Sequence, residues 1–126
     1  MLFGGFVGTE VAQTQRNFTT NSTILSGEIG LLTTVSDNSH HVVIFNTASN
    51  ITRLDGFIIT AGNANLTAER TRPLLPPPTF LPISMFNGGG IALDNGSSPI
   101  IINCKIINND AITGGRLLLQ MEAIQR

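Results

Sequence analysis

The stretch from Gly88 to Gly115, GGGIALDNGSSPIIINCKIINNDAITGG, holds the pattern that decides the fold. It opens on three glycines and returns to a glycine pair 26 positions later (114 − 88). Between the glycines lie a short apolar run, a turn-like DNGSSP, a second apolar run and an asparagine cluster. Short apolar runs bounded by Gly, Asn and Ser are typical of short β-strands separated by tight turns.

The same pattern occurs once more, upstream. Residues Val43–Ile59 align without a gap on Ile91–Ile107, at an offset of 48 (91 − 43). Apolar residues meet apolar residues and turn residues meet turn residues, whereas Thr52 and Arg53 match poorly. Such self-similarity at a fixed spacing indicates a repeat architecture. The alignment pairs Val43 with Ile91, Leu54 with Ile102, Asp55 with Asn103, Gly56 with Cys104 and Ile58 with Ile106.

A proline-rich segment explains why the glycine spacing and the alignment offset differ. Residues Asn65–Phe86 carry all but one of the six prolines of the chain and show neither strand alternation nor a helical period. Proline has no backbone donor and is excluded from central strands. We therefore expect Asn65–Phe86 to be a loop inserted between two units. Without it, one unit is a coil of roughly 26 residues, and the chain makes about four coils.

The sequence predicts a single all-β domain over residues 1–126, a right-handed parallel β-helix. Strands this short are stable when each coil bonds to the next at about 4.8 Å. The expected interior set includes Leu54, Ile58, Ile102 and Ile106. We expect asparagine side chains to stack at one corner, formed by Asn109 and Asp110 with Asn63 and Ala64. The expected strands are Thr23–Leu25, His41–Phe45, Leu54–Thr60, Gly90–Leu93, Ile100–Cys104 and Ile106–Asn108.

These residues resemble the repeats of right-handed parallel β-helix surface proteins, including the polymorphic outer-membrane protein repeats with Gly-Gly-Ala-Ile and Phe-x-x-Asn motifs. Residues Gly88–Ile91 stand for the first motif. Residues Ile106–Asn109 stand for the second, with Ile106 in place of Phe. The resemblance covers Phe3–Gly115 apart from the proline loop. The resemblance is specific for the β-helical coil, and the motifs that carry it contain no catalytic residue.

The resemblance implies a non-catalytic structural or adhesive segment of a secreted or surface-displayed bacterial protein. Surface glycans or other cell-surface proteins are the implied partners. The alternative is a fragment of a carbohydrate-active β-helix enzyme, a polysaccharide lyase or hydrolase, whose catalytic coils lie elsewhere. The opening MLFGGFVGTE lacks the basic residues and long apolar core of a signal peptide. We therefore expect the export signal to be missing from this fragment.

The tail departs from the repeat. After Gly114 and Gly115 the repeat predicts a third glycine and Ile, yet Arg116–Arg126, RLLLQMEAIQR, follows. Two explanations stay open: a short amphipathic helix that caps the coil, or a truncated or frame-shifted continuation. Uncapped coil ends expose unpaired strand edges, so we also expect self-association through them.

The charge and apolar patterns favour no nucleic acid or membrane partner. The net charge is −1, from 7 basic and 8 acidic residues, and this gives no electrostatic case for nucleic acid. The sequence contains no run of 18 apolar residues, so it predicts no transmembrane segment. Cys104, the single cysteine, lies in an apolar run and is expected to be a small buried hydrophobe.

No catalytic, cofactor or metal site is predicted. His40 and His41 are neighbours at the start of the expected strand His41–Phe45, and adjacent side chains of a strand point to opposite faces and cannot share one ion. Stacking places Asp55 near Asn103 and Asn46 near Asp94, which gives one carboxylate per pair. General acid–base cleavage of a glycosidic bond needs two carboxylates. The acidic residues are expected in turns or ladders: Glu10, Glu28, Asp37, Asp55, Glu69, Asp94, Asp110 and Glu122.

Overall fold

The computed structural model describes residues 1–65 and 88–112 as short β-strands joined by turns, without an α-helix in these residues. Two short 3-10 turns, η1 (Gln13–Gln15) and η2 (Val35–Asp37), lie in the connections. The described residues confirm the expectation that the chain is mostly β. The strands are β1 (Leu2–Phe3), β2 (Thr23–Ser26), β3 (Val43–Asn46), β4 (Arg53–Asp55), β5 (Phe57–Thr60), β6 (Asn63–Ala64), β7 (Ile91–Asp94), β8 (Ile100–Ile102), β9 (Lys105–Ile106) and β10 (Asp110–Ala111).

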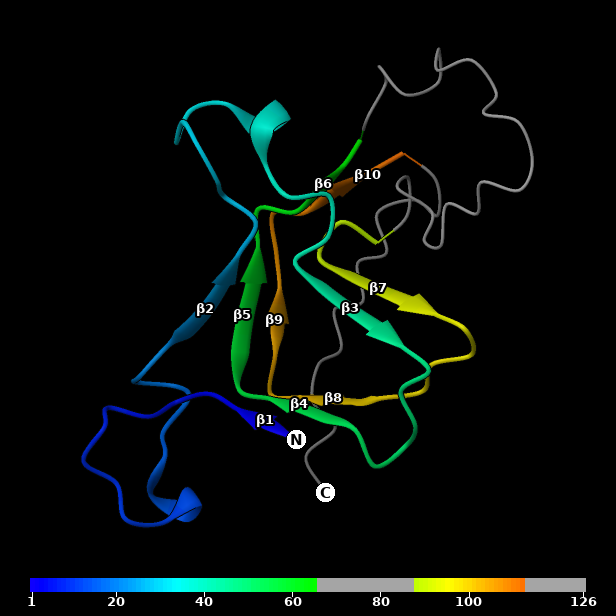
Figure 1. Cartoon of the computed structure of the whole chain (residues 1–126). Helices are drawn as coiled ribbons and strands as arrows, with labels where there is room; N and C mark the ends of the chain where they lie inside the picture. Colours follow the sequence, from blue (N-terminus) through cyan, green and yellow to red (C-terminus); the bar gives the residue numbers. More distant parts are fainter. Residues whose placement is uncertain (66–87, 113–126) are drawn as a thin grey trace.

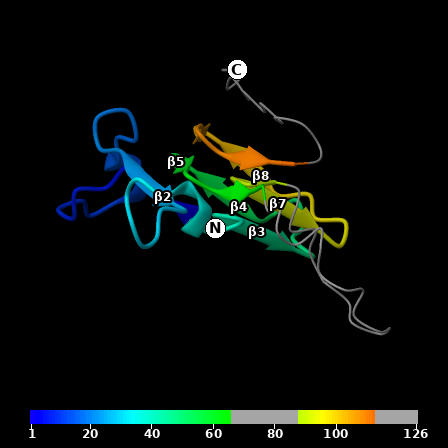
Figure 2. The same ribbon diagram turned by 90° about the horizontal axis from the view of Figure 1, so that it is seen from above.

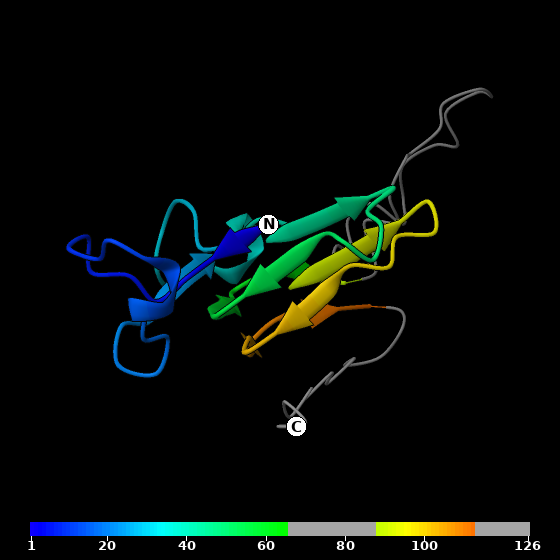
Figure 3. The same ribbon diagram turned by 90° about the horizontal axis from the view of Figure 1, so that it is seen from below.

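In the described part of the chain all strand pairs are parallel and form four small sheets, β1-β4-β8, β2-β5-β9, β3-β7 and β6-β10. The chain visits the faces in the same order each time. In Figure 1 the strands of one sheet lie next to one another, as for β2, β5 and β9, and in Figures 2 and 3 they lie in successive layers. The first layer is β1 to β3, the second β4 to β7, and the third β8 to β10. The described residues thus hold three layers, whereas the sequence predicts about four coils.

The spacing between paired residues confirms the repeat and corrects its register. Strand β3 pairs with β7 at the expected offset of 48, with Val43 opposite Ile91. Beyond the next turn the offset is 47, so Leu54 lies opposite Ile101 and not Ile102. Likewise Ile59 pairs with Ile106. The turn between β3 and β4 spans residues 47–52, and the turn between β7 and β8 spans 95–99, one residue fewer.

The one-residue change in register alters which side chains face the interior. The buried core consists of Phe45, Leu54, Phe57 and Ile59. Ile106 packs against this core, so Leu54 and Ile106 confirm the expected interior set. The expectation is wrong for Ile58 and Ile102, because neighbouring residues of a strand point to opposite faces. Ile58 alternates with the buried Phe57 and Ile59, and Ile102 lies opposite Asp55, whose side chain points outward.

Two expected strands are each broken by a corner. Leu54–Thr60 was expected as one strand, but Gly56 has a φ of 84° and separates β4 from β5. Asn103, with a φ of 53°, separates β8 from β9 in the next layer. Gly and Asn are the residues that adopt this left-handed conformation most readily. The chain therefore turns from one face to the next at the same place in both layers.

The glycine triplet lies where two segments approach each other closely. A Cβ atom on Gly89 would clash with the carbonyl oxygen of Asp110. A Cβ atom on Gly90 would lie 2.7 Å from the side-chain nitrogen of Asn109. Gly88 has a φ of 68°, which favours glycine. The triplet thus lets the chain enter β7 against the corner that leads into β10.

The expected asparagine ladder takes another form. Asp110 pairs with Asn63 and Ala111 with Ala64, so Asn109 is not the partner of Asn63. The Asn109 side chain bonds to backbone: its oxygen accepts from the Gly62 amide at 2.8 Å, and its nitrogen donates to the Ile59 carbonyl at 3.0 Å. A side-chain bond between asparagines of two layers forms elsewhere, from Asn95 to Asn46 at 2.7 Å.

Two expectations lie outside the described residues. These are the inserted loop, Asn65–Phe86, of which the structure describes only Asn65, and the tail, Arg116–Arg126. In residues 1–65 and 88–112 the structure has no helix with the length and apolar character needed to cross a membrane.

Candidate functional site

The most developed polar site in the described part of the chain surrounds Asp55, at the end of β4. Its side chain is 0% exposed although it points away from the interior. One carboxylate oxygen accepts from Arg16 at 2.8 Å and from Arg53 at 2.9 Å. The other accepts from the Asn103 amide, one layer away, at 2.8 Å. Three donors from three segments therefore converge on one carboxylate.

Arg16 comes from a long connection, residues 4–22, that projects from the corner between β1 and β2 (Figure 1). Its guanidinium lies over the rings of Phe3 and Phe18, at 5.2 Å from each ring centre. It also donates to the Gly4 carbonyl at 3.0 Å. The side chain is only 11% exposed. Cation–π contacts and a buried ion pair thus fasten this connection to the outside of the sheet formed by β1, β4 and β8.

The electrostatics of the cluster keep Asp55 ionised. Burial by itself raises the pKa of Asp55, but hydrogen bonds from Arg16, Asn103 and Arg53 outweigh it, and the pKa lies below its ordinary value of 3.8. Burial raises the pKa of the nearby Cys104 thiol, with backbone hydrogen bonds opposing the shift. The Cys104 side chain packs against the core, as expected for a small apolar residue. Neither group has the environment of an activated base or nucleophile.

The expected proximity of Asp55 and Asn103 is confirmed by the hydrogen bond between their side chains, although the strand partner of Asp55 is Ile102, and the two arginines are additional. Asn103 was expected beside Asp55 from the repeat alone. Arg16 lies 39 residues before Asp55 (55 − 16) in a connection without repeat character, so no periodic signal could place it there. Arg53, a poor match in the repeat alignment, reaches the carboxylate from two residues away along its own strand.

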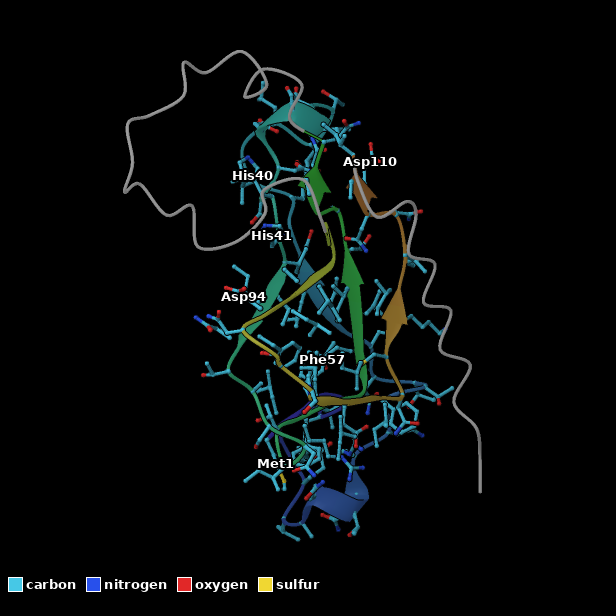
Figure 4. The ribbon with its side chains drawn as sticks, turned by 90° about the vertical axis from the view of Figure 1, so that its right-hand side faces the viewer. Met1, His40, His41, Phe57, Asp94 and Asp110 are labelled. Carbon is cyan, nitrogen blue, oxygen red and sulfur yellow. The ribbon has the colours of Figure 1, made fainter. Side chains whose placement is uncertain are left out.

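The second expected pair lies on the outside of the stack. Asn46 and Asp94 are partners in the β3–β7 ladder, as expected. The Asp94 carboxylate accepts from the backbone amide of Asn95 at 2.9 Å, which is a turn interaction. In Figure 4 Asp94 lies at the outside, whereas Phe57 lies between the strands.

Other carboxylates also bond locally. Glu10 accepts from the backbone amides of Val7 and Gly8 at 2.8 and 2.9 Å, and these hydrogen bonds, Val7 first, lower its pKa. Asp37 accepts from the Leu31 amide at 3.0 Å. Asp110 accepts from the Asn65 side chain at 2.9 Å. Each of these carboxylates holds a turn or joins two layers.

The two histidines do not form a metal site with other residues of the described chain. The Nδ1 atom of His41 lies 3.0 Å from the Gly88 carbonyl oxygen, so this ring joins the first layer to the glycine triplet. Within residues 1–65 and 88–112, no three His, Cys, Asp or Glu side chains are grouped so that they could hold a metal ion. Glu69 and Glu122 lie outside the described residues.

No family model matches this chain, and neither a curated protein nor a solved structure matches it.

Proposed function

We propose that this chain is a segment of a right-handed parallel β-helix and serves as a structural or adhesive part of a secreted or surface-displayed bacterial protein. The observation that carries the proposal is the order of the strands. Three layers place parallel strands in the same sequence of faces, and the second and third layers pair at an offset of 47 residues, whereas β1–β4 and β2–β5 pair at offsets of 52 (54 − 2) and 34 (57 − 23). Connections between parallel strands of one sheet are right-handed in nearly all proteins, which supports the assignment of the hand.

The layered arrangement suits a rod that displays loops. Backbone hydrogen bonds run along the stack, and each further layer lengthens it by about 4.8 Å. The connections at 4–22 and 27–42 leave the stack at its corners (Figure 1). The Asp55 cluster fastens the first of these to the second layer through Arg16. A rod with loops held at fixed positions is suited to reach from a surface and contact a partner.

The charged groups favour this role over the alternative of a carbohydrate-active fragment. The Asp55 carboxylate is shared by two arginines and an amide, and both of its oxygens are occupied. Its partner across the layers is an asparagine side chain, and that of Asp94 is Asn46. General acid–base cleavage of a glycosidic bond requires two carboxylates facing each other across the bond. Each of these two pairs supplies only one carboxylate.

The test compares binding with turnover. Labelled protein is applied to a glycan array, and unlabelled protein is incubated with pectin and with alginate while new reducing ends and unsaturated products are followed. We expect no turnover; binding to a subset of glycans supports adhesion, and no binding supports a purely structural part. Turnover that is lost on Asp55→Asn would overturn the proposal in favour of the enzyme fragment.

A further inference from the structure

The strands of the two outer layers pair on one side only among the described residues. In the middle layer, β4 lies between β1 and β8, and β5 lies between β2 and β9. Within residues 1–65 and 88–112, the strands β1, β2 and β3 bond only to the second layer, and so do β8, β9 and β10. Figure 3 shows the two outer layers on opposite sides of the middle one. Each outer layer therefore offers a row of backbone donors and acceptors facing away from the stack.

Side chains of paired residues stack from layer to layer in columns. Along the columns of Leu54 and Ile59 the exposure of the side chains is lower in the middle layer than in the outer layers. Leu54 in the middle layer is 3% exposed, whereas Leu2, its partner in the first layer, is 53% exposed. Ile59 is 0% exposed, whereas Leu25 and Ile106 on either side of it are half-buried. A column position is thus fully buried when a layer covers it on both sides. The apolar cross-section continues to both outer layers.

The first layer also lacks the charges that usually protect a strand edge. Its strands read LF, TILS and VIFN and contain no Lys, Arg, Asp or Glu. In the third layer β8 reads III, whereas β9 and β10 carry Lys105 and Asp110. Exposed edges without charge, proline or bulge readily pair with another chain. The first layer and β8 of the third layer are therefore suited to accept another layer.

We propose that a second copy of this chain supplies that layer, head to tail, with the first layer of one copy on the third layer of another. On two faces the contact repeats pairings that the chain makes between its own layers, with β1 on β8 and β2 on β9; in the described residues β3 has no counterpart in the third layer and β10 has none in the first. Leu2 of one copy continues the column of Leu54 and Ile101, and Leu25 continues the column of Ile59 and Ile106. On the outer face, Ile24 meets Lys105, so no like charges oppose each other.

The two surfaces differ, so the contact is heterologous and does not close on itself. Such contacts generate open filaments, in contrast to the paired surfaces of a two-fold dimer. The chain is therefore expected to form rods whose length grows with concentration. This inference depends on the layered structure and not on the adhesive role, so its failure leaves the glycan experiments unaffected.

The first experiment measures association of the full 126-residue chain by sedimentation velocity over a hundredfold range of concentration. We expect the mean mass to rise with concentration. Ile24→Lys places a charge on the outer edge of β2, at a side chain already 57% exposed, and should raise the concentration needed for association at least tenfold. Ile51→Lys adds the same charge in a turn, at 73% exposure, and should behave as the parent. A monomeric parent, or equal effects of both variants, overturns the proposal.

The second experiment tests the head-to-tail contact directly. In a Cys104→Ser background, Ile24→Cys and Lys105→Cys are made as separate proteins and mixed. Ile24 and Lys105 both lie opposite Ile58 within one chain, so between stacked copies their substituents become neighbours. Mild oxidation should yield mainly the mixed disulfide, identified by mass. A statistical mixture, or mainly disulfides between identical copies, would contradict the head-to-tail arrangement, even if the chain associates.

Discussion

Gly56 and Asn103 occupy the same position in successive layers, and both have a positive φ, 84° and 53°. They follow Asp55 and Ile102, which are paired partners. Asn103 has a second role, because its side-chain nitrogen donates to the Asp55 carboxylate at 2.8 Å. One residue therefore makes the corner of the third layer and supplies a hydrogen bond to a buried charge of the second.

Substitutions at Asn103 should separate these two roles. Asn103→Gly keeps the left-handed corner and removes the hydrogen bond, so we expect a loss of about 1 kcal/mol in the free energy of unfolding. Asn103→Asp removes the donor and places a second carboxylate against Asp55, so its loss should be larger, about 2–3 kcal/mol. Urea unfolding at pH 7 measures both. An Asp variant as stable as the Gly variant would show that the contact with Asp55 has no energetic weight.

Acid should remove the contribution that the Asp55 cluster makes to the free energy of unfolding. The pKa of Asp55 is below 3.8 in the folded protein, so its stabilising effect is complete above that value and is lost as the pH falls through the folded pKa. Arg16→Gln removes one guanidinium and should flatten the decline in stability below about pH 4. Thermal melts between pH 2 and 7 measure this. In an Asp55→Asn background, Arg16→Gln should no longer change the acid response; an unchanged difference would assign the effect to another carboxyl.

The close approach at the glycine triplet predicts a steric effect. Gly89→Ala directs a methyl group into the Asp110 carbonyl, so we expect a loss of about 1–3 kcal/mol from overpacking. Gly96→Ala serves as the comparison. Gly96 has a φ of 70° and open space around its Cβ position, so only the backbone strain of about 1 kcal/mol applies. Equal melting temperatures for Gly89→Ala and the parent would mean that β7 and β10 are not held this closely.

Two neighbouring isoleucines in β5 provide a matched test of the inward face. Ile59 is 0% exposed and lies in the core, whereas Ile58 points outward and is half-buried. Ile59→Ala should cost about 2–5 kcal/mol, because it leaves a cavity. Ile58→Ala removes the same atoms and should cost less than about 1.5 kcal/mol. A larger loss for Ile58→Ala would reverse the two faces.

The sequence pattern predicted the longer strands and their parallel stacking, but not the short strands β6 and β10 nor the register of every strand. Residues 100–107 read IIINCKII, with isoleucine at both odd and even positions. An offset of 47 and an offset of 48 therefore both pair apolar residues with apolar residues. The shorter turn at residues 95–99 decides between them, and turn length does not follow from hydrophobicity.

The Asp55 cluster could be predicted only where it follows the repeat. The repeat alignment at an offset of 48 set Asn103 against Asp55, so their proximity was expected; in the structure Asp55 is paired with Ile102, and the side chain of Asn103, one residue further on, donates to the carboxylate. Arg16 and Phe18 lie in the connection of residues 4–22, whose path depends on tertiary contacts, and Arg16 reaches the Asp55 carboxylate from there. A long connection carries no periodic signal, because its side chains follow neither strand nor helix spacing.

The most direct test of the central claim, parallel stacking with the second and third layers at an offset of 47 residues, is a pair of engineered disulfides in a Cys104→Ser background. Ile58 and Lys105 are paired partners with side chains on the outer face, and paired Cα atoms of adjacent strands lie about 4.8 Å apart, within disulfide range. Ile58→Cys with Lys105→Cys should oxidise within one chain, with the melting temperature kept or raised. Ile58→Cys with Ile106→Cys, the pair at the offset of 48, should stay reduced, because Ile106 faces the core. A bond in the second pair and none in the first would contradict the stacked register.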